Sequence, residues 1–273
     1  MNRSVKLALL LLASTLVGLL TIHLVADLTT TVQLRQRLQP PSAAFILGTD
    51  ELGRDFLSCL ASGATLSLVV AAMVVAMTAL LGTALGMTAG LAGGTIDGLI
   101  MRSGDVLLAF PGFLLALALM AFLGQGIPNL ILALTANGWV VYARLVRAEV
   151  LTLKQQDFVQ AARAYNASNW RIASRHLLPL LWPQIVVQAA AGMASVILVE
   201  SSLNFLGLGV DPRRPTLGQL IDAGRVHLFD APRLIILPGL MLVLLILPFT
   251  LLADSNKKRT VSETGSRSPG ENR

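Results

Sequence analysis

The sequence predicts an all-α membrane protein with six transmembrane helices, and three observations predict it. The chain has a mean hydropathy of +0.70 and 13% charged residues, about half the charged fraction of a soluble domain. Its apolar residues fall into six blocks, each long enough to cross the hydrocarbon core of a bilayer, about 30 Å thick, as a helix. Between the fourth and fifth blocks lies a polar stretch, Val146 to Pro179. We expect this stretch to lie outside the membrane and to present a surface to a binding partner.

The first apolar block is Leu7 to Ala26, an uncharged run that follows two basic residues. It is longer than the core of a cleavable signal peptide, about 7–15 residues, and shows no convincing small-x-small cleavage site. We therefore interpret it as a retained span behind a short N-terminus of residues 1–6. Residues 27–62 are polar and contain Pro40 and Pro41, which break helices, so we expect an extramembrane segment there.

The same pattern predicts the other spans and the segments between them. Spans are expected at Ala64 to Leu91, Val106 to Leu123, Asn129 to Leu145, Gln184 to Leu206 and Leu234 to Ala253. A short polar turn is expected at Gly93 to Arg102, a loop at residues 146–183, a second loop at residues 207–232, and a disordered tail at residues 254–273. Residues 7–253 thus form one transmembrane domain. Pro111, inside the third span, predicts a kink.

The basic residues set the orientation. With the N-terminus inside, fourteen lysines and arginines lie on the cytoplasmic side and seven outside, while the acidic residues of the two sides are equal in number. The positive-inside rule therefore places both termini and loop 146–183 in the cytoplasm, and loops 27–62 and 207–232 outside. The pI near 10.2 reflects this topology, so we expect membrane lipid as a partner and no nucleic acid.

The chain lacks the residue patterns of common catalytic and metal sites. It has no Gly-x-x-x-x-Gly-Lys-[Ser/Thr] phosphate loop, no Gly-x-Ser-x-Gly and no His-Glu-x-x-His. Its one cysteine, Cys59, and three scattered histidines give no metal-ligand spacing. We therefore expect no enzyme activity, no metal and no cofactor bound by this chain. A secondary transporter or a membrane enzyme remains as an alternative, although neither the charge relay of the first nor the catalytic set of the second is visible.

The polar stretch has the periodicity of helices. Leu151, Phe158, Ala162 and Tyr165 recur at helical spacing. This predicts two short amphipathic helices with a break at Ala164 to Ser168. Because the chain has no phosphate loop of its own, we interpret the stretch as the contact for an energy-supplying subunit on another chain.

Two features inside the spans have two interpretations each. Gly82, Gly86, Gly90 and Gly94 repeat every four residues, which predicts either close helix packing or a sliding contact. Glu200 is an ionisable residue in the fifth span. It either belongs to a translocation path or, near the outer end of its helix, is satisfied by water or by contacts at the helix end.

Three sequence motifs, in order along the chain, carry a resemblance to a known family. They are Leu47-Gly48-Thr49-Asp50-Glu51-Leu52-Gly53-Arg54-Asp55; Gln160-Ala161-Ala162 with Asn166 and Leu178-Pro179; and Ser202 to Gly209, followed by Pro212, Pro215, Gly218, Gly224 and Arg225. Over nearly its full length the chain resembles the permease subunits of bacterial ABC importers of the dipeptide/oligopeptide/nickel class. The second motif falls at the spacing of that family's Glu-Ala-Ala, Gly and Leu-Pro loop.

The resemblance implies a fold, an activity and partners. The fold is that of a type I ABC importer permease in the bacterial inner membrane, and the activity is ATP-driven import of dipeptides or oligopeptides, with nickel or a metal–opine chelate as the alternative cargo. The partners are a second, homologous permease, expected to form a heterodimer, two ATPase subunits that bind ATP and Mg²⁺, and an extracytoplasmic solute-binding protein. The loop's short helix would sit in a groove of an ATPase subunit, with Ala161 and Ala162 as its buried face.

The sequence departs from the family pattern at three positions. Gln160 stands where the family usually has Glu, Cys59 where it often has Arg, and Asn166 where it usually has Gly. Asn is the residue next best able to adopt a left-handed backbone conformation, so we expect the turn to be kept. For Gly48 to Asp55 we weigh an outer gate or docking surface for the binding protein against a loop-folding motif held by an Asp50–Arg54 or Arg54–Asp55 contact.

Overall fold

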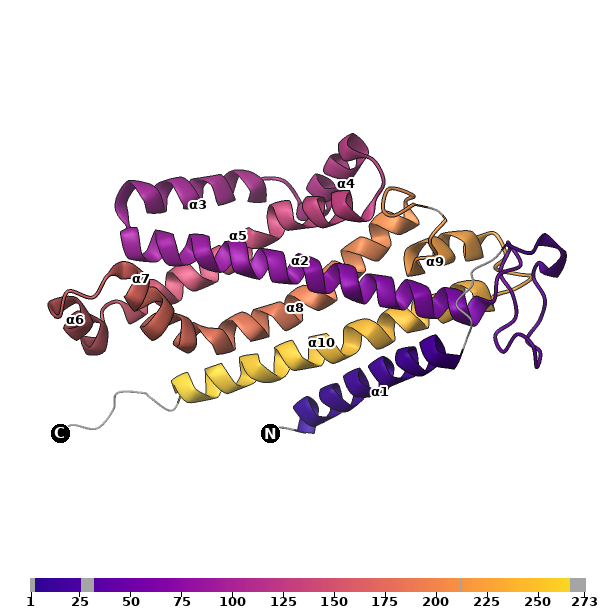
Figure 1. Cartoon of the computed structure of the whole chain (residues 1–273), viewed down its shortest axis with the longest axis horizontal. Helices are drawn as coiled ribbons and strands as arrows, with labels where there is room; N and C mark the ends of the chain where they lie inside the picture. The colour runs from indigo at the N-terminus through magenta and orange to yellow at the C-terminus, as the bar shows by residue number, and fades with distance from the viewer. Residues whose placement is uncertain (1–2, 26–31, 212, 266–273) are drawn as a thin grey trace. The chain divides into compact units, whose positions relative to one another are not determined.

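The computed structural model describes residues 3–25, 32–211 and 213–265, and these are helical almost throughout (Figure 1). In this part of the chain the only β-pairing is an isolated bridge between Thr49 and Asp55. The all-α prediction is therefore confirmed. Residues 1–2, Ala26 at the end of the predicted first span, residues 27–31 of the predicted outer segment, Pro212 and the end of the predicted tail (266–273) lie outside the described residues.

Among the described residues, five helical stretches are long and apolar enough to cross a membrane, and a sixth crossing is possible if one bent helix pair counts as a span. The long helices are α1 (Arg3–Val25), α2 (Phe56–Ala92), α5 (Ile127–Leu153), α8 (Leu178–Phe205) and α10 (Arg233–Gly265). The helix α7 (Asn169–Arg171) and the π-helix η2 (Ile172–Leu177) lead directly into α8. The bent pair is α3 (Gly94–Leu108) and α4 (Gly112–Leu123).

The bent pair corrects two predictions. The third span was expected as one kinked helix, but α3 and α4 meet at an angle of 83°. Pro111 explains the break, because it has no N–H to donate and disfavours the helical conformation at Phe110. The polar turn expected at Gly93 to Arg102 is also wrong, since residues 94–102 belong to α3.

Several helices run past the predicted spans. α2 begins at Phe56 instead of Ala64, so the last part of the predicted outer segment is helical. α5 continues to Leu153, and α10 continues beyond Ala253 to Gly265, into the predicted tail. Hydropathy marks only the apolar part of each helix, and a helix can continue where its side chains become polar.

The chain folds into two compact units, which we describe separately. The first comprises Met1–Leu68, Ala190–Leu206 and Pro212–Arg273, and the second comprises Val69–Ala189 and Gly207–Asp211. In the first unit, α1 and the helix α9 (Leu217–Arg225) pack on α10, and Figure 1 shows α1 alongside α10. α9 begins where the Thr216 hydroxyl accepts a hydrogen bond of 3.2 Å from the Gln219 N–H, an ordinary helix cap. The loop predicted at residues 207–232 is thus partly helical.

In the second unit, one apolar core joins the long helices to the polar stretch. It contains Met87, Tyr142, Val146, Val150, Val159, Ile172, Ala173, Leu177, Leu181 and Ile185. These side chains come from α2, α5 and α8 and also from η2 and the short helix α6 (Asp157–Ala164). The segment predicted to lie outside the membrane therefore shares its core with transmembrane helices.

Glycines bring α2 and α5 close together in the second unit. A Cβ atom added to Gly82 or Gly86 would lie 2.4 Å from a backbone carbonyl oxygen of α5, and one added to Gly90 would lie 2.6 Å from the Val150 side chain. The close approach predicted from the four-residue repeat is confirmed at these three positions. Gly94 differs, since a Cβ there would meet nothing within 4 Å and the residue begins α3.

Candidate functional site

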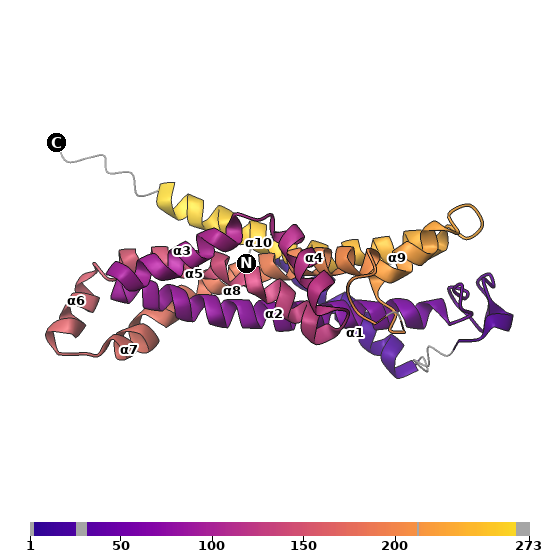
Figure 2. The same ribbon diagram turned by 90° about the horizontal axis from the view of Figure 1, so that it is seen from above.

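The polar stretch forms a helical hairpin, which we call the α6–α7 hairpin (residues 154–177). α6 ends at Ala164 and α7 begins at Asn169, so the first short helix and the break after it are confirmed. The second short helix is not separate, because α7 continues through η2 into α8. Figure 2 shows α6 and α7 with the connecting turn between them. The first turn of α6 carries Asp157 and the last carries Arg163, each of which complements the partial charge of its helix end.

Asn166 makes the turn of the hairpin possible. Its φ of +57° is left-handed, as expected for the residue that replaces the family's Gly. Its N–H donates to the Arg163 carbonyl at 2.9 Å, and the Ala167 N–H donates to the Ala162 carbonyl at 3.0 Å. These two bonds form the common closure of a helix by a left-handed residue, and they satisfy carbonyls that α6 leaves free at its end.

The inward face of the hairpin contains only Ala162 among the hairpin residues that share the helical spacing. Val159 is fully buried in the core of the second unit, and Ala162 and Ala167 pack against that core. Phe158 and Tyr165, which the helical spacing grouped with Ala162, are instead exposed. Because α6 has only two turns with apolar residues on both sides, periodicity could not choose between Val159 and Phe158.

The outward face of the hairpin is polar, aromatic and basic. We call it the hairpin surface, and it consists of the exposed residues Phe158, Gln160, Ala161, Arg163, Tyr165, Trp170, Arg171 and Arg175. Tyr165 is 88% exposed and Trp170 is 79% exposed. Ala161 thus lies on this exposed surface, whereas Ala162 is partly buried and packs against the chain's own core.

Polar contacts and the start of α8 anchor the base of the hairpin. The Lys154 ammonium donates to the Gly90 carbonyl of α2 at 3.0 Å. Earlier on α5, the Arg147 guanidinium forms a two-bond ion pair with Asp97 of α3, one bond of which is 2.6 Å. Leu178 packs against the core, while Pro179 is exposed just after the π-helical turn η2, within one continuous helix. The hairpin is therefore fixed to α2, α5 and α8 within its unit.

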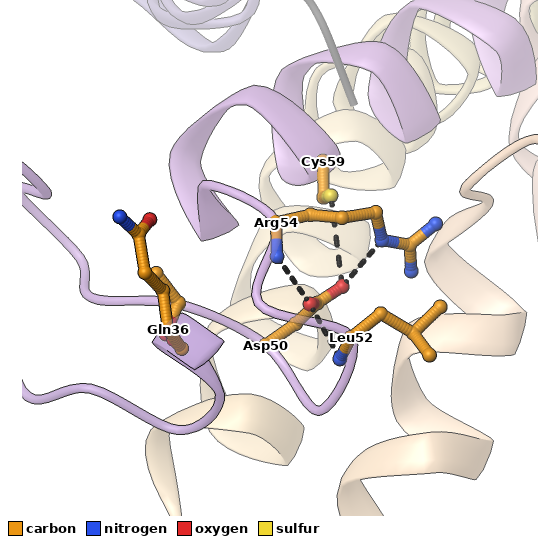
Figure 3. Close-up of polar contacts among 6 residues, drawn as sticks. Gln36, Asp50, Leu52, Arg54 and Cys59 are labelled. Carbon is orange, nitrogen blue, oxygen red and sulfur yellow. Dashed lines mark hydrogen bonds and ion pairs between the residues drawn. The ribbon is translucent and has the colours of Figure 1, made fainter. Parts of the chain in front are cut away.

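The signature motif of the first loop (residues 32–55) is built on a buried ion pair, shown in Figure 3. The Arg54 Nε atom lies 2.6 Å from Asp50 Oδ2, and both side chains are buried. The backbone N–H groups of Leu52 and Arg54 donate to Asp50 Oδ1 at 2.9 and 2.8 Å. Cys59 Sγ is 3.9 Å from Asp50 Oδ2. Of the two contacts predicted for Arg54, the structure contains the one with Asp50.

Asp55, the last residue of the motif, directly precedes α2. Its carboxylate accepts hydrogen bonds of 2.9 Å from the Ser58 N–H and 2.5 Å from the Ser58 hydroxyl. A carboxylate at this place satisfies a free N–H of the first turn and interacts favourably with the positive end of the helix.

Close backbone contacts explain the glycines of the motif. Gly48 has a φ of +76°, and a Cβ atom on it would lie 2.3 Å from the Gln39 carbonyl oxygen. Gly53 has a φ of +73°, and a Cβ atom on it would lie 1.9 Å from the Gln33 carbonyl oxygen. Only glycine adopts this conformation without strain in so little space. Thr49 is fully buried.

Two side chains hold the first loop closed. The Thr49 hydroxyl accepts a hydrogen bond of 2.8 Å from the Gln39 N–H and donates to the Gln36 carbonyl. Arg233, the first residue of α10, donates to the Gln39 carbonyl at 2.8 Å and to the Leu47 carbonyl at 3.2 Å. These contacts favour the interpretation of residues 48–55 as a loop-folding motif.

Glu200 is fully buried in the first unit, with three hydrogen-bond donors. Its carboxylate accepts bonds of 2.8 Å from the Ser67 hydroxyl, 2.6 Å from the Asn204 amide and 3.2 Å from the Ser201 hydroxyl. A buried carboxylate needs such partners to offset its lost hydration. The sequence showed Ser201 and Asn204 next to Glu200, but Ser67 comes from α2 and only the fold brings it there.

Comparison with known proteins gives a consistent result. The profile of the family described as "binding-protein-dependent transport system inner membrane component" matches residues 82–261. The dipeptide transport system permease protein DppC of Alkalihalophilus pseudofirmus is 35% identical over 218 residues, which are 80% of this chain and 72% of that protein. The glutathione transport system permease protein GsiD of Shigella flexneri is 44% identical over 214 residues, 78% of this chain and 71% of that protein.

A solved structure has the same fold. The chain aligns with the inward-facing MetNI methionine ABC transporter with a TM-score of 0.59 and 18% sequence identity, over 74% of this chain and 95% of that one. At this identity the likeness concerns the arrangement of the helices alone.

Proposed function

Because the chain belongs to the family of binding-protein-dependent transport system inner membrane components, we propose that it forms half of the path through which an ABC importer moves short peptides. The family and fold predicted from the sequence are confirmed: the chain is a multi-pass inner-membrane permease with the type I importer fold. Such a permease is a transport component and not a catalytic enzyme. The cargo, the coupling to ATP and the composition of the assembly are the proposal.

The names of the relatives support peptides as the cargo. One relative is a dipeptide permease and the other a permease for glutathione, which is itself a small peptide. Nickel or a metal–opine chelate is the alternative cargo. The translocation path is shared with a second, homologous permease, and an extracytoplasmic solute-binding protein delivers the peptide.

The proposed coupling between the ATPases and the permease is supported by the two faces of the α6–α7 hairpin. One face of it belongs to the apolar core that contains residues of α2, α5 and α8, and the other face is exposed. An exposed helix that is fixed to transmembrane helices is suited to transmit rigid-body motion. In the proposal, an ATPase subunit receives Gln160, Ala161 and the rest of the hairpin surface in a groove.

ATP and Mg²⁺ bind to two such ATPase subunits, and closure of the pair moves the hairpins. The charge distribution supports placing the hairpin and both termini in the cytoplasm, where the ATPases lie. The first loop then lies outside, on the side of the solute-binding protein.

Reconstitution tests this proposal. The chain would be placed in lipid vesicles with the second permease, the ATPases and the binding protein encoded nearest to its gene. Uptake of labelled dipeptide, glutathione, Ni²⁺ and a nickel–opine complex would then be measured. We expect peptide uptake only when ATP and the binding protein are both present. Uptake driven by an ion gradient without the ATPases would make the chain a secondary transporter, and ATP-dependent uptake of nickel without peptide would move it to the metal branch.

A further inference from the structure

The hairpin surface is basic and aromatic, and we infer from it that the receiving groove of the ATPase is acidic, with carboxylates around an apolar pocket. The inference rests on the proposed docking of an ATPase at this hairpin. It adds the chemistry of the partner's groove, which membership of the family does not supply.

The guanidinium groups of the hairpin surface are available to a partner. Arg163, Arg171 and Arg175 are all exposed, and among the residues that the structure describes no ion pair engages them. The arginines at the end of α5 differ, because Arg144 and Arg147 each pair with an aspartate of α3. Within the described part of the chain, the charges of the hairpin arginines are therefore not neutralised by an ion pair.

Few negative charges oppose these arginines on the hairpin. Between residues 155 and 180 the only carboxylate is Asp157, and it lies in the first turn of α6, where the positive end of the helix partly offsets its charge. Gln160 is exposed and neutral at the position where the resemblance leads one to expect a glutamate. The surface thus has a net positive charge, and a partner of complementary potential is negative.

The aromatic side chains supply the apolar part of the contact. Tyr165 and Trp170 lie on the two sides of the Asn166 turn and are 88% and 79% exposed, while Phe158 is 42% exposed. Aromatic and arginine side chains carry much of the binding energy at protein interfaces when they fill pockets. Since the turn is closed by two backbone hydrogen bonds, these side chains project from a rigid support, which lowers the entropic cost of binding.

A lipid surface fits these observations less well than a protein groove does. A membrane-bound amphipathic helix buries a continuous apolar face in the lipid, Trp and Phe included, whereas α6 has only eight residues and turns Val159 into the chain's own core. What remains outside is a short aromatic and charged surface with a fixed shape.

Binding measurements across a salt series test the inference. The full-length chain in zwitterionic nanodiscs would be titrated with the ATPase subunit encoded nearest to its gene, from about 0.1 M to about 1 M salt, over which the Debye length falls from about 10 to about 3 Å. We expect Arg163→Glu, Arg171→Glu and Gln160→Glu each to weaken binding by about 3- to 10-fold at the lower salt, with the differences vanishing at the higher. Arg102→Glu, on an exposed arginine of α3, is the matched control and should bind as the unmodified chain does.

The outcomes separate the inference from the proposed function. Tighter binding of Gln160→Glu, or unchanged binding of both arginine variants, would overturn the acidic groove and leave the docking intact. Failure of the unmodified chain to bind the ATPase at all would overturn the proposed function. An effect of the variants that appears only in anionic nanodiscs would assign the surface to lipid and overturn the inference. Restored binding of Arg171→Glu by a carboxylate-to-lysine change in the ATPase groove would support it directly.

Discussion

The hydroxyl group of Ser67 donates a 2.8 Å hydrogen bond to the carboxylate of Glu200, across 133 positions of sequence. This bond joins α2 to α8 inside the first unit, and the Asn204 amide donates a second hydrogen bond of 2.6 Å to the same side chain. An ionisable residue in a membrane span is a candidate for the translocation path, but these contacts give Glu200 a structural task.

We therefore expect Glu200→Ala to act on folding. The change leaves the buried Ser67 hydroxyl without the carboxylate that accepts its hydrogen bond, at a cost of about 1–3 kcal/mol, while the Asn204 amide keeps its 3.0 Å bond to the main-chain carbonyl of residue 200. The unfolding midpoint in detergent and the yield of folded protein should both fall, and the protein that does fold should take up peptide with an unchanged KM. A variant with normal stability and a raised KM would place Glu200 in the translocation path instead.

Arg54→Ala tests the first loop. Removing one partner of a buried ion pair leaves the other charge uncompensated, which costs about 3–5 kcal/mol, and Asp50 is 3% exposed. We expect the protein level to fall sharply, whereas Arg37→Ala, on an exposed arginine of the same loop, should be tolerated. Normal protein level with weakened affinity for the solute-binding protein would show that the loop is a docking surface.

Ala161 and Ala162 differ in exposure although they are neighbours on α6. Ala161→Asp puts a charge on the hairpin surface and should abolish stimulation of the ATPase while thermal stability stays normal. Ala162→Asp also puts a charge against the chain's own core, so it should lower stability as well as coupling. Thermal unfolding and ATPase assays on both variants check this difference. Unchanged stimulation in Ala161→Asp would contradict docking at the hairpin.

Asn166 tolerates glycine and resists other residues, because its φ is +57°. We expect Asn166→Gly to keep full ATPase coupling and Asn166→Ala to destabilise the hairpin by about 1 kcal/mol, the cost of a left-handed conformation with a Cβ atom. Hydrogen exchange of the Ala167 N–H, which closes the turn, reports this directly. Equal protection in the two variants would contradict the left-handed turn.

Gly86→Leu should separate α2 from α5, since even a Cβ atom there would lie 2.4 Å from a backbone oxygen. The expected result is a loss of folded protein, because the backbone of α5 cannot move aside as a flexible side chain can. Gly98→Ala in α3, where a Cβ atom would meet nothing within 4 Å, is the control and should be neutral. If Gly86→Leu folds and fails only in transport, the contact slides during the cycle.

Much of the fold could be predicted because it depends on local properties of the chain. The apolar blocks predicted the crossing helices, and the four-residue glycine repeat predicted the close contact of α2 and α5. The Asp50–Arg54 pair was predictable because i and i+4 residues lie close within one turn-rich motif. The break at Pro111 was underestimated, because a proline inside an apolar run is compatible with a kink or with a complete end of the helix, and packing chooses between them.

The sequence by itself determined the class of protein, the positions of the apolar parts of its long helices and the turn at Asn166, since hydropathy and backbone preference act over a few neighbouring residues. The tertiary structure alone decided that Val159 faces inward while Phe158 and Tyr165 face outward, and that Glu200 meets Ser67. Those choices depend on which residues, distant in sequence, pack against α6 in the core and which residue donates the hydrogen bond to Glu200. A short helix with apolar residues on both sides has no periodicity that could reveal that choice beforehand.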